Sequence, residues 1–150
     1  MNKYILVSLL LLICSTSVNS KEIQIKNHDK RYNLGLNNEE KAIFLSEMRQ
    51  MLTSVQQIMM GIGMNDKAMI IKAARYSGNR MARATPQSIK DKTPVSFEQI
   101  GGPTHMMFEE LIINAEEIDE GDTEDMASLA EFTGILMKNC LACHVAFKAD

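Results

Sequence analysis

The chain has 150 residues, which leaves room for one domain of ordinary size. Its formal net charge is −3, so nucleic acid binding, which needs a basic surface, is not expected. The composition includes twelve Met and no Trp, and aliphatic and thioether side chains must therefore fill most of the core.

The first twenty residues have the parts of a secretory signal peptide. Lys3 supplies a positive start, Ile5–Cys14 is an almost unbroken apolar run, and Val18–Ser20 offers small residues before a cleavage point. The apolar run is about ten residues long, whereas a membrane-spanning helix needs roughly twenty. We therefore expect residues 1–20 to be cleaved and the mature protein to be periplasmic, without stable membrane insertion. A membrane anchor and a lipid anchor at Cys14 are the alternatives.

Residues 21–37 have no clear period, and we expect them to form a loosely held N-terminal arm before the folded domain at residues 38–150. Asn37 or Asn38 can cap a first helix. Apolar residues then recur at the three- and four-residue spacing of an amphipathic helix, at Leu45, Met48, Leu52, Val55, Met59 and Ile62.

Gly61 and Gly63 mark the end of this helix, and Asn65 can cap a second one. The apolar face of the second helix contains Met69, Ile70, Ala73, Ala74 and Met81. Gly78 is a weak point within it. The stretch Ala84–Thr104 holds all three prolines and two adjacent glycines, a composition that favours a long link between helices. A link of this length should pack on the body of the domain.

Two further helices are predicted after the link. The third begins at Thr104, ends at Gly121 and buries Met107, Phe108, Leu111, Ile112 and Ala115. Asp122 or Thr123 caps the fourth, whose apolar stripe is Met126, Leu129, Phe132, Leu136, Cys140, Cys143 and Phe147. No segment alternates as a strand does. We therefore predict an all-α fold, an antiparallel up-down-up-down four-helix bundle.

The run Cys140-Leu141-Ala142-Cys143-His144, near the end of the fourth helix, has the spacing of a c-type haem attachment sequence. Residues at i, i+3 and i+4 share one face of a helix. Two thiols can therefore bond to the vinyl groups of one porphyrin while the imidazole reaches the iron. The motif predicts one haem c, covalently bound through Cys140 and Cys143, with His144 as the proximal iron ligand.

Two other chemistries can use a Cys-x-x-Cys pair. A thiol–disulfide oxidoreductase usually places the pair at a helix N-terminus, where the helix dipole stabilises the thiolate. The pair Cys140 and Cys143 instead falls late in a helix, with no strand–helix–strand pattern around it. A zinc site would need four tetrahedral ligands, which one helix seldom supplies through two Cys and the adjacent His. Both remain alternatives to haem.

Phe147–Lys148 follows the motif, and here the chain resembles the class II c-type cytochromes, the cytochrome c-prime group. The resemblance covers about Asn38–Asp150, although the family more often has Tyr and Arg after the motif. The stretch Ala84–Pro94, with His105 and Phe108, is similar to the central loop and third helix of the soluble b-type cytochrome of this topology. The resemblance implies a four-helix bundle that holds its haem near the C-terminal end of the fourth helix.

The other side of the iron has several candidate ligands. In this topology the first half of helix one lies beside the end of helix four, which favours Met48 or Met51. Met59 lies roughly 16 Å beyond Met48 and is too far. The resemblance implies that Met48 is the methionine ligand and that the adjacent Arg49 pairs with a haem propionate. Met51, His105 and an iron without a second ligand remain open alternatives.

These expectations together describe a periplasmic monohaem c-type cytochrome that carries one electron between redox partner proteins and acts on no substrate. The alternative is a five-coordinate cytochrome c-prime that binds nitric oxide or another small gas. The resemblance also implies that two copies can pair as a homodimer through helices one and two. Nine acidic residues within Glu109–Asp125 and seven basic residues within Lys67–Lys92 predict a charge asymmetry that can steer encounter with partners.

Overall fold

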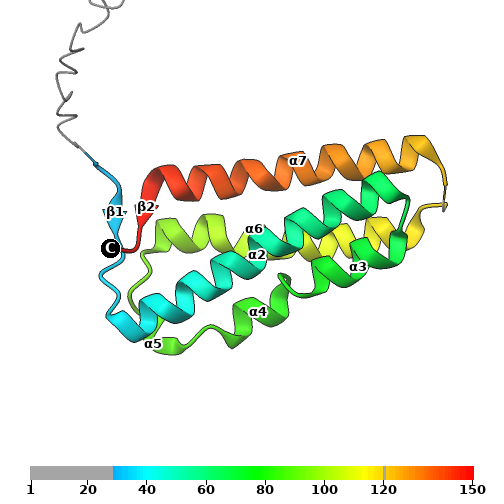
Figure 1. Ribbon diagram of the computed structural model, residues 1–150. Coiled ribbons are helices and arrows are strands. Elements are labelled where there is room, and N and C mark those ends of the chain that lie inside the picture. The colour runs from blue at the N-terminus through cyan, green and yellow to red at the C-terminus, as the bar shows by residue number, and fades with distance from the viewer. Residues whose placement is uncertain (1–28, 120) are drawn as a thin grey trace, which may run out of the picture.

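The computed structural model describes residues 29–119 and 121–150, so the predicted signal peptide at residues 1–20 lies outside the described residues. Most of the described chain is helical (Figure 1). The elements are β1 (Tyr32–Asn33), α2 (Asn38–Met64), α3 (Lys67–Arg75), α4 (Asn79–Ala84), α5 (Gln87–Lys90), α6 (Val95–Glu117), α7 (Thr123–Ala146) and β2 (Phe147–Lys148). The predicted all-α class is confirmed. In this part of the chain, no helix is both long enough and apolar enough to cross a membrane.

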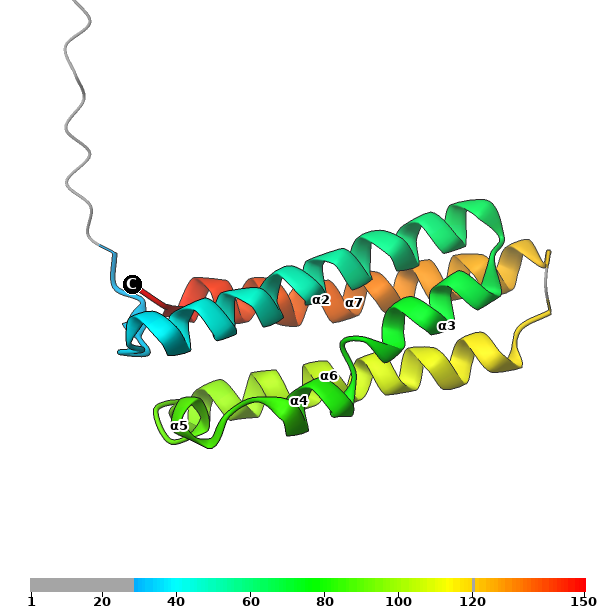
Figure 2. The ribbon, with the colours of Figure 1, turned by 60° about the horizontal axis from the view of Figure 1, so that its bottom comes forward.

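The helices form a bundle-like arrangement. Helix α2 contacts both α3 and α7, and helix α6 also contacts both α3 and α7. In Figure 1, α2 and α6 run in one direction, whereas α3 and α7 run in the other. Figure 2 shows α4 lying along α6, with which it is in contact. The start of α2 and the end of α7 therefore lie at the same end of the molecule, where β1 and β2 also pair.

Helix α2 begins as predicted, with a capping box. The Asn37 side chain accepts a hydrogen bond from the Glu40 amide at 3.0 Å, and the Glu40 carboxylate accepts one from the Asn37 amide at 2.9 Å. The helix continues past Gly63 and ends at Met64, because Asn65 takes the left-handed conformation, with φ of 55°, that closes a helix.

The Glu40 carboxyl also forms an ion pair with Lys92, and this contact predicts a pH effect on stability. The Lys92 ammonium, together with the Asn37 amide, holds the pKa of Glu40 below its ordinary value of 4.5. A carboxyl whose pKa is lower in the folded state stabilises the fold above pH 4.5 and loses that contribution as the pH falls through the folded pKa. The melting temperature should therefore fall more steeply on acidification in the native protein than in Glu40→Gln. Parallel circular dichroism melting curves for the two proteins would contradict this.

The prediction of a long link at residues 84–104 is wrong for much of this range. It contains α5, and α6 begins at Val95 rather than at Thr104. Pro103 lies inside α6 and cannot donate a backbone hydrogen bond to the Gln99 carbonyl. The next residue, Thr104, donates its hydroxyl to the Ile100 carbonyl at 2.7 Å. Phe97 packs its ring against those of Phe44 and Phe147, at centroid distances of 5.9 and 5.3 Å. Tertiary packing of this first part of α6 therefore overrides its unfavourable local composition.

The interior consists of two apolar clusters. The main core contains Val55, Ile58, Ile70, Ala73, Ala74, Phe108, Leu111, Ile112, Ala115, Met126, Leu129 and Leu136. The end cluster contains Leu34, Leu36, Phe44, Ile89 and Phe147. The stripes predicted for the later helices are buried or partly buried as expected.

The stripe predicted for the first helix is partly wrong. Leu52 and Met59 are 70% and 45% exposed, whereas Phe44 and Ile58 are buried. The buried face of α2 also includes Ser54, whose hydroxyl accepts a hydrogen bond from the Ser77 hydroxyl at 2.8 Å. Because Ser54 is polar, a pattern of apolar residues alone does not assign it to the buried face of α2.

The C-terminal part of the expected arm is not loose. Tyr32 pairs with Phe147 and Asn33 with Lys148 in a two-stranded parallel sheet, so a short strand pair exists that the sequence did not indicate. Leu34 and Leu36 are buried in the end cluster. The described residues before α2 are thus fastened to the C-terminal end of the chain.

Candidate functional site

Helix α7 places the cysteine motif in its last two turns. The helix begins at Thr123 and is capped by Asp122, whose carboxylate accepts hydrogen bonds from the amides of Glu124 and Asp125 at 2.7 and 3.1 Å. It then runs without interruption to Ala146. The motif therefore lies near a helix C-terminus, as predicted, where the dipole does not favour a thiolate.

The two motif thiols point toward apolar surroundings. Cys140 and Cys143 are both free cysteines and both partly buried. Cys140 packs against the main core, and Cys143 packs against the end cluster. Burial raises the pKa of each thiol above its ordinary value of 9.0. The sulfurs are therefore protonated at neutral pH and shielded from much of the solvent.

His144 differs from expectation, since its side chain is exposed while the two thiols are partly buried. One residue step rotates a helix by about 100°, so His144 is turned well away from Cys143 although it follows Cys140 by one turn. Its backbone carbonyl accepts a hydrogen bond from the Arg31 guanidinium at 3.4 Å. Within the described residues, no group of three or more His, Cys, Asp and Glu side chains is placed to hold a metal ion.

Two methionines of α2 pack against the same apolar clusters as the two motif thiols. Met48 is partly buried against the end cluster, where Cys143 also packs. Met51 is partly buried against the main core, where Cys140 also packs. Met59, in contrast, is 45% exposed. The structure therefore keeps both early methionines as candidate ligands and excludes Met59 from the interior.

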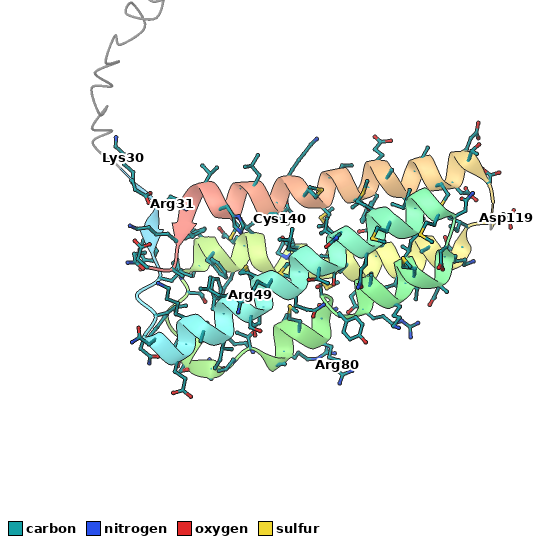
Figure 3. All side chains as sticks on the ribbon, in the orientation of Figure 1. Lys30, Arg31, Arg49, Arg80, Asp119 and Cys140 are labelled. Carbon is teal, nitrogen blue, oxygen red and sulfur yellow. The ribbon has the colours of Figure 1, made fainter. Side chains whose placement is uncertain are left out.

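The structure places Arg49 and His105 in surroundings different from those of the two thiols. Arg49 is exposed on α2 (Figure 3). The Nδ1 atom of His105 lies 2.7 Å from the Ser77 carbonyl oxygen. Because a carbonyl only accepts hydrogen bonds, Nδ1 carries the proton and donates it. His105 thereby ties α6 to the turn between α3 and α4.

A set of polar side chains inside the bundle was not predicted. The Thr85 hydroxyl donates to the Glu47 carboxylate at 3.1 Å, and burial raises the pKa of Glu47. Two turns further along α2 lies Ser54, whose buried hydroxyl accepts a hydrogen bond from the Ser77 hydroxyl. The sequence contained one signal, because Glu47 follows the buried Phe44 by three residues. Glu47 and Ser54 thus place hydrogen-bonding groups on α2 before and after Met48 in the sequence.

Two surface cavities lie away from the motif. One, of about 710 Å³, lies between α2 and α3 and is lined by Gln50, Thr53, Gln56, Gln57, Met60, Asp66, Ala68, Met69, Lys72 and Tyr76. A second, of about 320 Å³, lies between α6 and α7 and includes Leu129 and Phe132. None of the motif residues lines either cavity. Cys140 packs against the main core and Cys143 against the end cluster.

The donor set fits a covalently bound haem in its chemistry. Two free thiols lie on adjacent turns against apolar clusters, an accessible imidazole follows the second thiol, and a thioether from Met48 or Met51 packs on the same clusters. Comparison of the chain with protein-family models, curated proteins and solved structures finds no match. The motif and its surroundings are therefore the basis for assigning a function.

Proposed function

We propose that the protein is a monohaem c-type cytochrome that carries one electron between redox partner proteins. One observation supports this most strongly: Cys140 and Cys143 are free, partly buried thiols on adjacent turns at the end of α7, and His144 follows directly. The holoprotein would be an antiparallel up-down-up-down four-helix bundle with the haem near the C-terminal end of α7. It would catalyse no reaction on a substrate.

Each residue of the site has a distinct role in this proposal. Cys140 and Cys143 would form the two thioether bonds to one haem c, and His144 would bind the iron from the proximal side. A haem bound there supplies an iron that takes up and releases one electron. The main core and the end cluster surround the two sulfurs and limit the access of water to them.

We assign the second iron ligand to Met48. Met48 packs against the end cluster, which contains Phe147 and against which Cys143, the residue directly before His144, also packs. A neutral thioether ligand paired with an imidazole would raise the reduction potential of the iron relative to stronger donor ligands. Met51 is the second choice, because it packs near Cys140 instead. Arg49 is exposed, and an exposed guanidinium beside Met48 suits a propionate at the surface.

The proposed setting is the periplasm, reached through the N-terminal signal peptide, and the proposed partners are redox proteins, with a homodimer as the oligomeric state to test. The acidic residues expected to steer these encounters are only partly engaged within the molecule. Glu116 pairs with Arg75 at 3.1 Å, for example, and both side chains are more than half exposed. Exposed charges of this kind act mainly on association rates and weaken with salt.

Replacing Met48 tests the electron-carrier assignment. The native protein, once reduced, should show a sharp low-spin spectrum that does not change with carbon monoxide. We expect Met48→Ala to remove the second ligand, so that the reduced spectrum becomes high-spin and shifts when carbon monoxide is added. Optical titration with the gas measures this.

Met59→Ala is the matched control, because Met59 lies on the same helix with an exposed side chain. It should behave like the native protein. A gas response in Met51→Ala but not in Met48→Ala would move the ligand to Met51. A native protein that already binds carbon monoxide would instead support the gas-binding cytochrome c-prime.

A further inference from the structure

The described residues before α2 cross the end of α7. We call Asp29–Leu36 the strap. Its β1 strand runs parallel to β2, with Tyr32 opposite Phe147, and the Leu34 amide donates to the Lys148 carbonyl at 2.9 Å. These contacts attach the strap to the residues that immediately follow the cysteine motif.

The side chain of Arg31 contacts the cysteine motif itself, at its last residue, His144. Its Nη1 donates to the backbone carbonyl of His144 at 3.4 Å. The last carbonyls of a helix have no partner within the helix, and a cation there also interacts favourably with the helix dipole. Arg31 thus acts on the turn that bears the imidazole through a backbone hydrogen bond.

Asp29 holds the Arg31 side chain in this position. The two Asp29 carboxylate oxygens accept hydrogen bonds from Nε and Nη2 of Arg31 at 3.0 and 2.8 Å. Such a two-point contact fixes the plane of a guanidinium. Asp29 also lies 3.8 Å from the Lys148 ammonium, which in turn pairs with Asp150. The strap and the C-terminus are therefore joined by a network of charges as well as by the strand pair.

Apolar contacts anchor the strap on the cluster that holds the second thiol. Leu34 and Leu36 are 4% and 7% exposed and pack with Phe147 in the end cluster. The Tyr32 ring meets the Phe147 ring edge-on at a centroid distance of 6.2 Å. Cys143 packs against this same cluster. Movement of the strap would therefore disturb both the cysteine and the histidine at the end of the motif.

We propose that the strap positions the proximal ligand, with Arg31 as the positioning residue that holds the backbone of His144. This inference rests on the proposed function and deepens it, because it assigns control of the iron–imidazole bond to a segment near the start of the mature chain. The exposed imidazole of His144 has little packing of its own, so its direction depends on how firmly its helical turn is held. Figure 3 shows Arg31 beside the paired strands at this end of the molecule.

The test compares Arg31→Ala with Lys30→Ala in the full mature holoprotein. Lys30 is an exposed cation next to Arg31, so the control removes the same charge. Loss of one hydrogen bond should speed amide hydrogen exchange at Cys143–Phe147 by about three- to tenfold in Arg31→Ala. In a Met48→Ala background, where the reduced iron lacks its second ligand and the iron–histidine stretching band can be observed, Arg31→Ala should also shift and broaden that band in the resonance Raman spectrum. Lys30→Ala should match the native protein, and Arg31→Lys should fall between.

The possible failures of the two proposals are distinguishable. A protein without covalent haem overturns both the function and the positioning role. If haem is bound and Arg31→Ala leaves the iron–histidine band of the Met48→Ala background unchanged, the positioning role alone is overturned, whether or not amide exchange is faster. Leu34→Ala provides an independent check, because it loosens the strap through its apolar anchor and should produce the same change in the band.

Discussion

The His144→Ala variant should keep its covalent haem and lose its low-spin spectrum. The thioether bonds depend on Cys140 and Cys143, which are untouched, so the porphyrin should stay attached. The iron loses its nitrogen ligand, however, and axial ligands set haem potentials over a range of roughly 0.8 V. We expect a shift of the midpoint potential on the order of 0.1 V, measured by optical redox titration.

His105→Ala is the control for this variant, because His105 is a partly buried histidine whose ring hydrogen-bonds the Ser77 carbonyl. Its spectrum and potential should remain native. If His105→Ala loses the low-spin spectrum as well, His105 replaces Met48 as the second ligand. A native spectrum in His144→Ala would contradict the assigned proximal ligand.

Phe108→Ala should cause the largest loss of stability among single core substitutions. The Phe108 side chain is fully buried at the centre of the main core. Replacing a buried phenylalanine with alanine costs about 3–5 kcal/mol, since apolar contacts are lost and a cavity remains. This corresponds to a decrease in melting temperature of roughly 10 °C or more for a domain of this size. Urea unfolding followed by circular dichroism measures the free energy directly.

Ile113→Ala is the matched control on the same helix, because Ile113 is 55% exposed. Its stability should stay within about 0.5 kcal/mol of the native value. Equal losses in the two variants would mean that α6 does not present Phe108 to the interior. The buried face assigned to α6 would then be wrong.

The helix ends that local signals define were predicted well. Asn37 caps α2 and Asp122 caps α7, as their side-chain oxygens and the acidic residues after them indicated. Gly78 was expected only as a weak point within one helix, whereas the structure ends α3 at Arg75 and begins α4 at Asn79. The two caps depend on residues a few positions apart, which a single sequence displays directly.

Features that depend on distant contacts were missed. Helix α6 starts at Val95 despite Pro103 because Phe97 packs between Phe44 and Phe147, residues from the two ends of the domain. The β1–β2 pair is only two residues per strand, too short to show alternation. The role of Arg31 at the His144 carbonyl left no signal in the sequence, because the two residues are 113 positions apart.

The candidate site also combines features that local sequence defines with features that depend on distant contacts. The spacing of Cys140, Cys143 and His144 is local, and the sequence placed these residues correctly near the end of a helix. The choice between Met48 and Met51 depends on which cluster each side chain meets, and the apolar stripe drawn through Leu52 was rotated from the true buried face. Direction around a helix, rather than position along it, is what the sequence failed to provide.

The mass of the purified, denatured protein tests the central claim most directly. The full chain should be produced in a host that attaches haem c and exports the protein to its periplasm. The account predicts the mass of residues 21–150 plus one haem, with no thiol left to titrate at Cys140 or Cys143. A mass equal to the polypeptide alone, with these two cysteines reduced or joined in a disulfide, would contradict it.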